Sequence, residues 1–439
     1  MLHVTVILPS GVVIPPEDRH LLRGAAAVSV PVAAHRFEEA FLFLRKNVFA
    51  GRQRTQTFNL ISELERQKHP LLYCLAGCCN AALGRFPVVA RLWQKIESRF
   101  IPGREFDRMI RESKPEVIIT ANYGTESFEV RLLRAAHRHG VPTVAIIPSW
   151  DNLSSKGVIG ENPRHLAVWN SIMREEAISL YGFKEGAIHI CGGLQFDLYA
   201  SQRPASERDL ILQRLGIDLR HPFVVIGTIT PRYFANNVDM VDIVNRAVMD
   251  GRLPSNLQIV VRLHPQVVAH AHFGDDLEQY RERAAAHGRI KLSIPRILRW
   301  GSITPPSPED GAELMTLLQH AAAAIMPAST LAIDACALGT PVIGIGFDGY
   351  ESRPYQQSVR RMFDFTHYRR IVAQGGLRIA GSQDMLVSEL SAYLHDRARD
   401  SEGRARIVAS QLGTADGRAW SRVLSVVEKV TESQARALV

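Results

Sequence analysis

The chain has 439 residues, more than one hydrophobic core usually organises, so two domains are expected. Hydrophobic residues make up 46% of the chain and charged residues 22%, values that exclude a disordered or collagen-like protein. The net charge of +8 favours an anionic partner over a cationic one.

The N-terminus opens on an apolar strand, residues 3–9, without the basic region and cleavage site of a signal peptide. The five cysteines show no C-x2-C pair of the kind that binds zinc, and we interpret them as reduced thiols. The longest charge-free stretch, residues 70–84, is shorter than the roughly 20 residues that cross a bilayer. These features predict a cytoplasmic protein without a transmembrane helix.

Most of the positive charge lies in one zone. Residues 40–111 contain 13 Lys and Arg side chains against five acidic ones. A zone of this kind suits the anionic inner leaflet of a membrane or a nucleic acid. The charge-free stretch within it, which contains a single aromatic residue, favours the membrane, so we expect peripheral contact with an anionic membrane and no nucleic acid. A solvated basic face without a partner stays open as the alternative.

Strands and helices alternate through the first half of the chain. Helix 125–139 carries apolar residues at helical spacing and ends at Gly140, and helix 171–181 is expected to be capped by Ser171. The apolar runs that predict strands are 115–122, 141–147, 165–169 and 187–191. This alternation predicts a parallel sheet.

A polar stretch at residues 200–205 resembles a hinge, so we place the domain boundary there, giving domains 1–203 and 204–439. A second alternating series follows and ends in a helical C-terminal tail from residue 384. Its predicted strands are 222–229, 257–263, 290–294, 323–326 and 341–345. The fold class is therefore α/β, with two Rossmann-like domains.

In parallel sheets, ligands bind beyond the carboxyl ends of the strands. His264 ends one predicted strand, and Pro265 stops the ladder after it, which holds the imidazole at the sheet edge. A histidine bonded to a neighbouring carbonyl is the alternative interpretation.

Two more strand ends of the second half carry polar groups. Ser329 and Thr330 open a helix, where free N–H groups favour a phosphate, and Asp334 follows one turn later, able to bond a ribose. The turn after the domain's first strand offers hydroxyls and a cation that suit a diphosphate: Thr228, Thr230 and Arg232.

The segment Arg262–Pro265, followed by the Ser-Thr-x3-Asp-x4-Gly-x-Pro pattern of Ser329–Pro341, resembles the donor half of GT-B nucleotide-sugar glycosyltransferases. It is similar to the bacterial surface-polysaccharide branch that includes CDP-glycerol glycerophosphotransferases, over about residues 220–395. The resemblance implies two parallel sheets that face each other across a cleft. It also implies a nucleotide donor in the C-terminal domain, with Arg262, His264, Ser329 and Thr330 near its phosphates. Asp334 stands where many relatives have a Glu that binds the ribose.

The N-terminal domain would then bind the acceptor. Trp150 could stack on a sugar ring, and Asn152 and Asn122 could bond its hydroxyls. Asp151 and Glu126 are the candidate catalytic bases that deprotonate an acceptor hydroxyl. For Asp151, a turn residue that bonds its own backbone is the alternative.

Together these features predict a glycosyltransferase that moves a sugar from a nucleotide-activated donor to a surface-glycan or lipid-linked acceptor. Two alternatives stay open: a polyol-phosphate transferase of the CDP-glycerol type, and a catalytically silent module that binds through its basic zone. No group of residues has metal-ligand spacing, so we expect no metal and no cofactor beyond the donor substrate.

Overall fold

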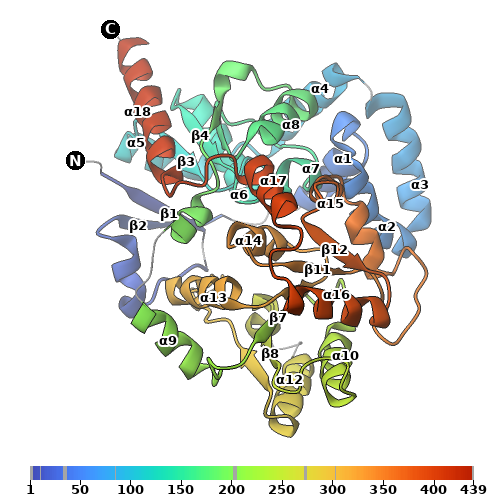
Figure 1. The fold of residues 1–439 in the computed structure, drawn as a ribbon. Coiled ribbons are helices and arrows are strands. Elements are labelled where there is room, and N and C mark those ends of the chain that lie inside the picture. Colours follow the sequence, from blue (N-terminus) through green and yellow to red (C-terminus); the bar gives the residue numbers. More distant parts are fainter. Residues whose placement is uncertain are drawn as a thin grey trace. The chain divides into compact units, whose positions relative to one another are not determined.

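A computed structural model describes residues 3–9, 11–32, 37–84, 86–200, 205–270, 274–301 and 303–437 of the chain (Figure 1). The chain divides into two compact units. Unit 1 comprises Met1–Leu194, Arg299–Ile303 and Arg418–Val439, and unit 2 comprises Gln195–Leu298 and Thr304–Gly417. The predicted boundary between residues 203 and 204 lies outside the described residues.

Unit 1 contains a parallel sheet with the strand order β3-β4-β5-β6 and a separate parallel pair, β1-β2. The strands are β1 (Thr5–Pro9), β2 (Ala26–Val30), β3 (Ile118–Thr120), β4 (Thr143–Ile146), β5 (His165–Val168) and β6 (Ile188–Ile190). The alternation predicted for the first half is confirmed, but β2 was not predicted. Ile7 and Val30 pack the pair β1-β2 against the core beside Ile118.

The helices of unit 1 are α1 (Glu38–Asn47), α2 (Gln56–Lys68), α3 (Pro70–Cys79), α4 (Pro87–Phe100), α5 (Asp107–Ser113), α6 (Ser127–Arg138), α7 (Asn152–Ser155), α8 (Ser171–Tyr181) and α18 (Ala419–Ala437). The predicted cap of α8 is wrong by one residue. Asn170 is the N-cap, and its Oδ1 accepts a hydrogen bond from the Met173 N–H at 2.9 Å. Gly182 ends the same helix at φ +72°, a left-handed conformation that glycine adopts without strain.

Helix α18 belongs to unit 1, although it follows unit 2 in the sequence (Figure 1). Its apolar face forms one core cluster with Val144 of β4 and Ala167 of β5; the helix contributes Val423, Val426 and Val430. Arg422 donates a hydrogen bond to the Cys191 carbonyl at 2.7 Å. The C-terminal helix therefore completes the core of the N-terminal sheet.

Unit 2 contains a parallel sheet with the strand order β12-β11-β10-β7-β8-β9. The strands are β7 (Phe223–Gly227), β8 (Gln258–Arg262), β9 (Ile290–Ser293), β10 (Ala324–Met326), β11 (Val342–Ile345) and β12 (Leu377–Ala380). The helices are α9 (Ala205–Arg214), α10 (Asn237–Met249), α11 (Pro265–Ala269), α12 (Gly274–Ala286), α13 (Pro308–His320), α14 (Leu331–Ala337), α15 (Thr366–Val372), α16 (Gln383–His395) and α17 (Ser401–Leu412). The predicted α/β class with two parallel sheets and a helical C-terminus is confirmed.

Because the strands of this sheet are parallel, their carboxyl ends share one edge. The paired register places the end of β7 between the ends of β8 and β10: Gly227 lies opposite Arg262, and Ile226 opposite Ile325. A Cβ at Gly227 would meet the Leu331 side chain at 2.4 Å. Glycine thus allows the first turn of α14 to approach the end of β7.

A buried ion network ties three helices of unit 1 together. Oε1 of Glu97 on α4 accepts from Arg45 of α1 at 3.0 Å and from Arg134 of α6 at 3.1 Å. Both guanidinium groups also donate to backbone carbonyls, Arg45 to Thr125 and Arg134 to Ile101 and Gly160. The network therefore holds the loop that follows β3 through the bond from Arg45 to its backbone.

Within the described residues, no single helix is long and apolar enough to span a membrane. Residues Pro70–Gly84 and Val88–Phe100 reach that length and composition only as a pair, which is bent by 114°.

The ion network generates a prediction for stability. Glu97→Gln leaves the buried guanidinium of Arg45 without a carboxylate and that of Arg134 with Glu161 at 3.5 Å, and we expect the free energy of unfolding to fall by about 3 kcal/mol. Urea denaturation measures it. The control is Glu112→Gln, which removes the exposed ion pair with Arg108 and should cost less than about 1 kcal/mol. Equal losses in the two variants would show that the network does not stabilise the fold.

Candidate functional site

Residues Thr228, His264, Ser329 and Thr330 follow the carboxyl ends of β7, β8 and β10, three neighbouring strands of unit 2. Thr228 Oγ1 accepts a hydrogen bond from the His264 N–H at 2.9 Å, which joins two of the three strand ends. The structure thus brings the residues predicted to bind the donor to one edge of one sheet.

His264 is the N-cap of α11. Its Nδ1 accepts from the Gln266 N–H at 3.2 Å, so the proton of the neutral imidazole is on Nε2. Burial and the nearby positive charge of Arg262 lower the pKa of His264. At neutral pH the side chain is therefore an uncharged ring with one N–H to donate.

Arg262 does not project from the strand end into solvent. Its guanidinium is buried, donates to Asp310 at 2.5 Å and to Ser293 Oγ at 3.0 Å, and lies 3.9 Å from Glu313. Its charge acts on His264, but its hydrogen bonds belong to this internal network. Asp310 lies 48 residues away in the sequence, and sequence reasoning missed it.

The turn after β7 is held by a buried asparagine. Asn237 Oδ1 accepts from the Ile229 N–H, and its Nδ2 donates to the Ile229 carbonyl, both at 3.0 Å. Thr230 is buried in this turn, whereas Arg232 is exposed on it. These two hydrogen bonds between the Asn237 side chain and the backbone of Ile229 fix the path of the turn. The only sequence signal for this role was the position of Asn237 at the start of a helix.

Ser329, Thr330 and Asp334 form a half-buried row at the start of α14. Ser329 Oγ accepts from the Leu331 N–H at 3.3 Å, and the Ser329 N–H donates to the Tyr368 hydroxyl at 3.3 Å. Thr330 is the N-cap residue and makes no side-chain cap bond to the helix. The serine side chain therefore closes the turn before the helix.

Asp334 accepts a hydrogen bond from the Tyr199 hydroxyl at 2.7 Å. Desolvation raises the pKa of Asp334 to about 6, although the bond from Tyr199 lowers it. Desolvation and this same carboxylate raise the pKa of Tyr199. Tyr199 lies 135 residues away in the sequence, so no local pattern indicates this contact.

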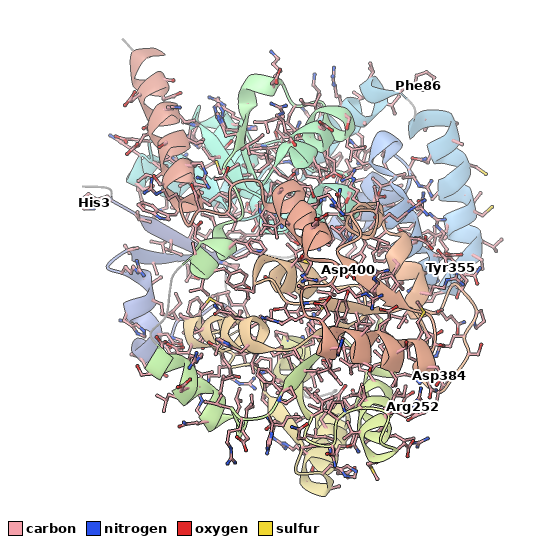
Figure 2. The ribbon with its side chains drawn as sticks, in the orientation of Figure 1. His3, Phe86, Arg252, Tyr355, Asp384 and Asp400 are labelled. Atoms are coloured by element: carbon pink, nitrogen blue, oxygen red, sulfur yellow. The ribbon has the colours of Figure 1, made fainter. Side chains whose placement is uncertain are left out.

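A cavity of about 410 Å³ lies beyond the carboxyl ends of β11 and β12, beside the first turn of α16. It is lined by Asp348, Arg353, Tyr355 and Ser382, among others, and Tyr355 is labelled in Figure 2. Asp348 accepts from the Val359 N–H at 2.8 Å, and this bond orders the wall of the cavity. None of the residues predicted to bind the donor lines it.

In unit 1, the predicted acceptor residues follow β3 and β4, which are neighbouring strands. The Trp150 side chain is only 4% exposed, so protein atoms cover the ring that was expected to stack on a sugar. Asn152 is buried and accepts from the Ser149 N–H at 3.0 Å. Asn122 Oδ1 accepts from the N–H and the hydroxyl of Thr125. These side chains shape the two loops.

The two predicted catalytic bases differ in their surroundings. Asp151 accepts from the hydroxyl of Ser149 at 2.5 Å and from that of Ser155 at 2.7 Å, so both carboxylate oxygens are engaged within its own turn. Glu126 is exposed at the start of α6 and makes no side-chain cap bond. Its negative charge raises the pKa of Lys46, which burial lowers more strongly. Glu126 is thus the more accessible of the two carboxylates.

The raised pKa of Asp334 predicts a pH-dependent stability. Because the folded carboxyl has a pKa of about 6 and the reference value is 3.8, its protonation stabilises the fold below pH 4, and this stabilisation is lost as the pH rises through 6. The free energy of unfolding of wild type should therefore fall relative to that of Asp334→Asn as the pH rises. We expect this difference to change by about 2 kcal/mol between pH 4 and pH 7, measured by urea denaturation. Tyr199→Phe should move the transition to higher pH, because it removes the bond that favours the carboxylate. A stability difference that stays constant with pH would contradict the assignment.

No protein-family model matches the chain, and no curated protein matches it by sequence. Solved structures do match it. The Staphylococcus aureus protein MnaA in complex with UDP is 13% identical, with 98% of this chain and 96% of that chain covered and a TM-score of 0.52. The UDP-GlcNAc 2-epimerase of Neisseria meningitidis bound to UDP-GlcNAc is 11% identical, with 98% and 100% covered and a TM-score of 0.51. At these identities the similarity shows the fold alone, and that fold is the GT-B type that the sequence resembles.

Proposed function

We propose that the chain is a nucleotide-sugar-dependent glycosyltransferase that binds its donor on unit 2 and its acceptor, a surface glycan or a lipid-linked glycan, on unit 1. The observation that carries the proposal is the grouping of Thr228, His264 and Ser329 at three adjacent strand ends. The Staphylococcus aureus structure is a complex with UDP and the Neisseria meningitidis structure a complex with UDP-GlcNAc, which supports a uridine nucleotide as the donor.

On the donor side, the neutral His264 ring offers Nε2–H to a phosphate oxygen of the leaving nucleotide. Negative charge grows on that oxygen when the bond between the sugar and the phosphate breaks, so the hydrogen bond strengthens in the transition state. The Thr330 hydroxyl at the start of α14 is a second donor for the same phosphates. Asp334, half-buried one turn further on, accepts from the ribose hydroxyls when ionised.

On the acceptor side, Glu126 takes the proton of the acceptor hydroxyl. The oxygen then attacks the anomeric carbon, and the electron pair of the broken bond stays on the nucleotide phosphate. Glu126 suits this role better than Asp151 because its carboxylate is exposed, whereas both oxygens of Asp151 accept bonds from serine hydroxyls.

A nucleotide-sugar epimerase is the second candidate, favoured by the similarity to the Neisseria meningitidis enzyme over 98% of this chain. The products separate the two functions. An epimerase converts UDP-GlcNAc into its epimer without an acceptor, whereas a transferase lengthens an acceptor and releases UDP. Proton NMR of UDP-GlcNAc incubated with the protein, with and without oligosaccharide acceptors, distinguishes them.

The donor site predicts a specific effect of His264. His264→Ala should weaken UDP binding about 10- to 100-fold, the effect of losing one hydrogen bond to a charged group. Isothermal titration calorimetry with UDP measures the dissociation constant. His221→Ala, at a half-buried histidine of unit 2, is the matched control and should bind as wild type does.

His264→Asn separates binding from folding. Asparagine is a good N-cap, so this variant keeps the cap of α11 but lacks Nε2–H. We expect wild-type stability together with the weak UDP binding of His264→Ala. Wild-type affinity in both variants would remove His264 from the donor site.

Glu126 predicts an effect on turnover alone. Glu126→Gln should lower UDP release in the presence of acceptor by about 10²- to 10⁴-fold, with UDP affinity unchanged. Asp151→Asn is the comparison. We expect it to lower the melting temperature, because the carboxylate that accepts hydrogen bonds from two serine hydroxyls is lost. Full turnover in Glu126→Gln would place the base elsewhere.

A further inference from the structure

Helices α3 and α4 expose more large apolar side chains than any other described segment of the chain. Leu71 is 81% exposed, Leu75 67%, Val88 72% and Leu92 57%. The further exposed apolar residues here are Leu72, Leu83, Phe86, Ile96 and Phe100. Figure 2 labels Phe86, which lies in the short link between the two helices. We call these nine residues, together with Arg91, Lys95 and Arg99, the apolar–basic surface.

The two kinds of side chain form parallel stripes on α4. Val88, Leu92, Ile96 and Phe100 are four residues apart and share one side of the helix. Arg91, Lys95 and Arg99 each precede an apolar residue by one position and form a second exposed stripe beside it. Within the part of the chain that the structure describes, no carboxylate pairs with these three basic side chains.

The opposite side of α4 fixes this orientation. Glu97 is buried between Arg45 and Arg134, and the Trp93 ring stacks on Phe49 with centroids 4.7 Å apart. Rotating α4 to bury its apolar stripe would expose this ion network and this aromatic contact. The stripe therefore stays at the surface.

Helix α3 extends the apolar part of the surface. Residues 70–84 contain no charged side chain, and Leu71, Leu72 and Leu75 point outward from the first turns of the helix. An apolar cluster of this size on an exposed surface marks an interaction site. It adjoins unpaired basic side chains within a zone of 13 basic against five acidic residues, so its partner must be both apolar and anionic.

We infer that the apolar–basic surface docks onto an anionic lipid bilayer. The leucines enter the boundary between headgroups and acyl chains, while Arg91, Lys95 and Arg99 contact lipid phosphates. An apolar stripe beside a basic one is the arrangement by which helices lie in a membrane interface without crossing it. This inference does not depend on the proposed catalysis, because it needs neither donor nor acceptor.

The test is co-sedimentation of the full chain with vesicles of phosphatidylcholine alone and of phosphatidylcholine with 30% phosphatidylglycerol, without nucleotide or glycan. We expect binding to the anionic vesicles that weakens as salt rises, because salt screens the basic stripe. Changing Arg91, Lys95 and Arg99 to Ser should lower the partition coefficient about 100-fold. Changing Leu71, Leu75 and Leu92 to Ser should lower it at least about tenfold.

Matched controls change equally exposed residues of unit 2: Leu210 and Met249 to Ser, and Arg281 to Ser. They should bind vesicles as wild type does, and all variants should keep the wild-type melting temperature. Failure of wild type to bind anionic vesicles at low salt would overturn the inference. An equal loss of vesicle binding in the unit 2 controls would also overturn it. The same holds if wild type is a dimer and the leucine variant is a monomer that binds vesicles as wild type does. UDP titration of the same samples reports on the proposed function separately.

Discussion

The buried carboxylate of Glu97 is the interaction on which much of unit 1 depends. A lone charge in this position would be strongly destabilising, and it persists because Arg45 and Arg134 both donate to it. Arg45 also donates to the carbonyl of Thr125, next to Glu126, and Arg134 donates to the carbonyls of Ile101 and Gly160. One helix, α4, thus supports the loop of the proposed base with its inner face and presents the apolar–basic surface with its outer face.

Local patterns were enough to predict most of the fold. Apolar runs between turns identified the strands of both sheets, and their alternation with helices identified the parallel topology. The missed strands, β2 and β12, are partly exposed and therefore carry a weak apolar signal. The packing of α18 on the first sheet was not predictable, because the sequence of an amphipathic helix does not indicate which core its apolar face packs against.

The candidate site was predictable in position but not in detail. Strand ends located His264, Ser329 and Asp334 at one sheet edge, since backbone topology alone decides that. Which side chains stay available depends on partners distant in sequence, such as Asp310 for Arg262. Arg262 consequently acts through His264, whose uncharged state it favours. Protonation of Nδ1 would cost α11 its cap, so the structure links the charge of this imidazole to local folding.

The packing of α18 also has a consequence for the order in which the chain folds during translation. Residues 195–417 are synthesised between the first sheet and the helix that covers it, an interval of about 20 s at roughly 10 residues per second. Over that time the face of β4 and β5 that receives Val423, Val426 and Val430 has no helix on it. Unit 2, in contrast, leaves the ribosome as one stretch of chain that is interrupted only by residues 299–303, which belong to unit 1. The half of the protein that leaves the ribosome first is therefore the last to complete its core.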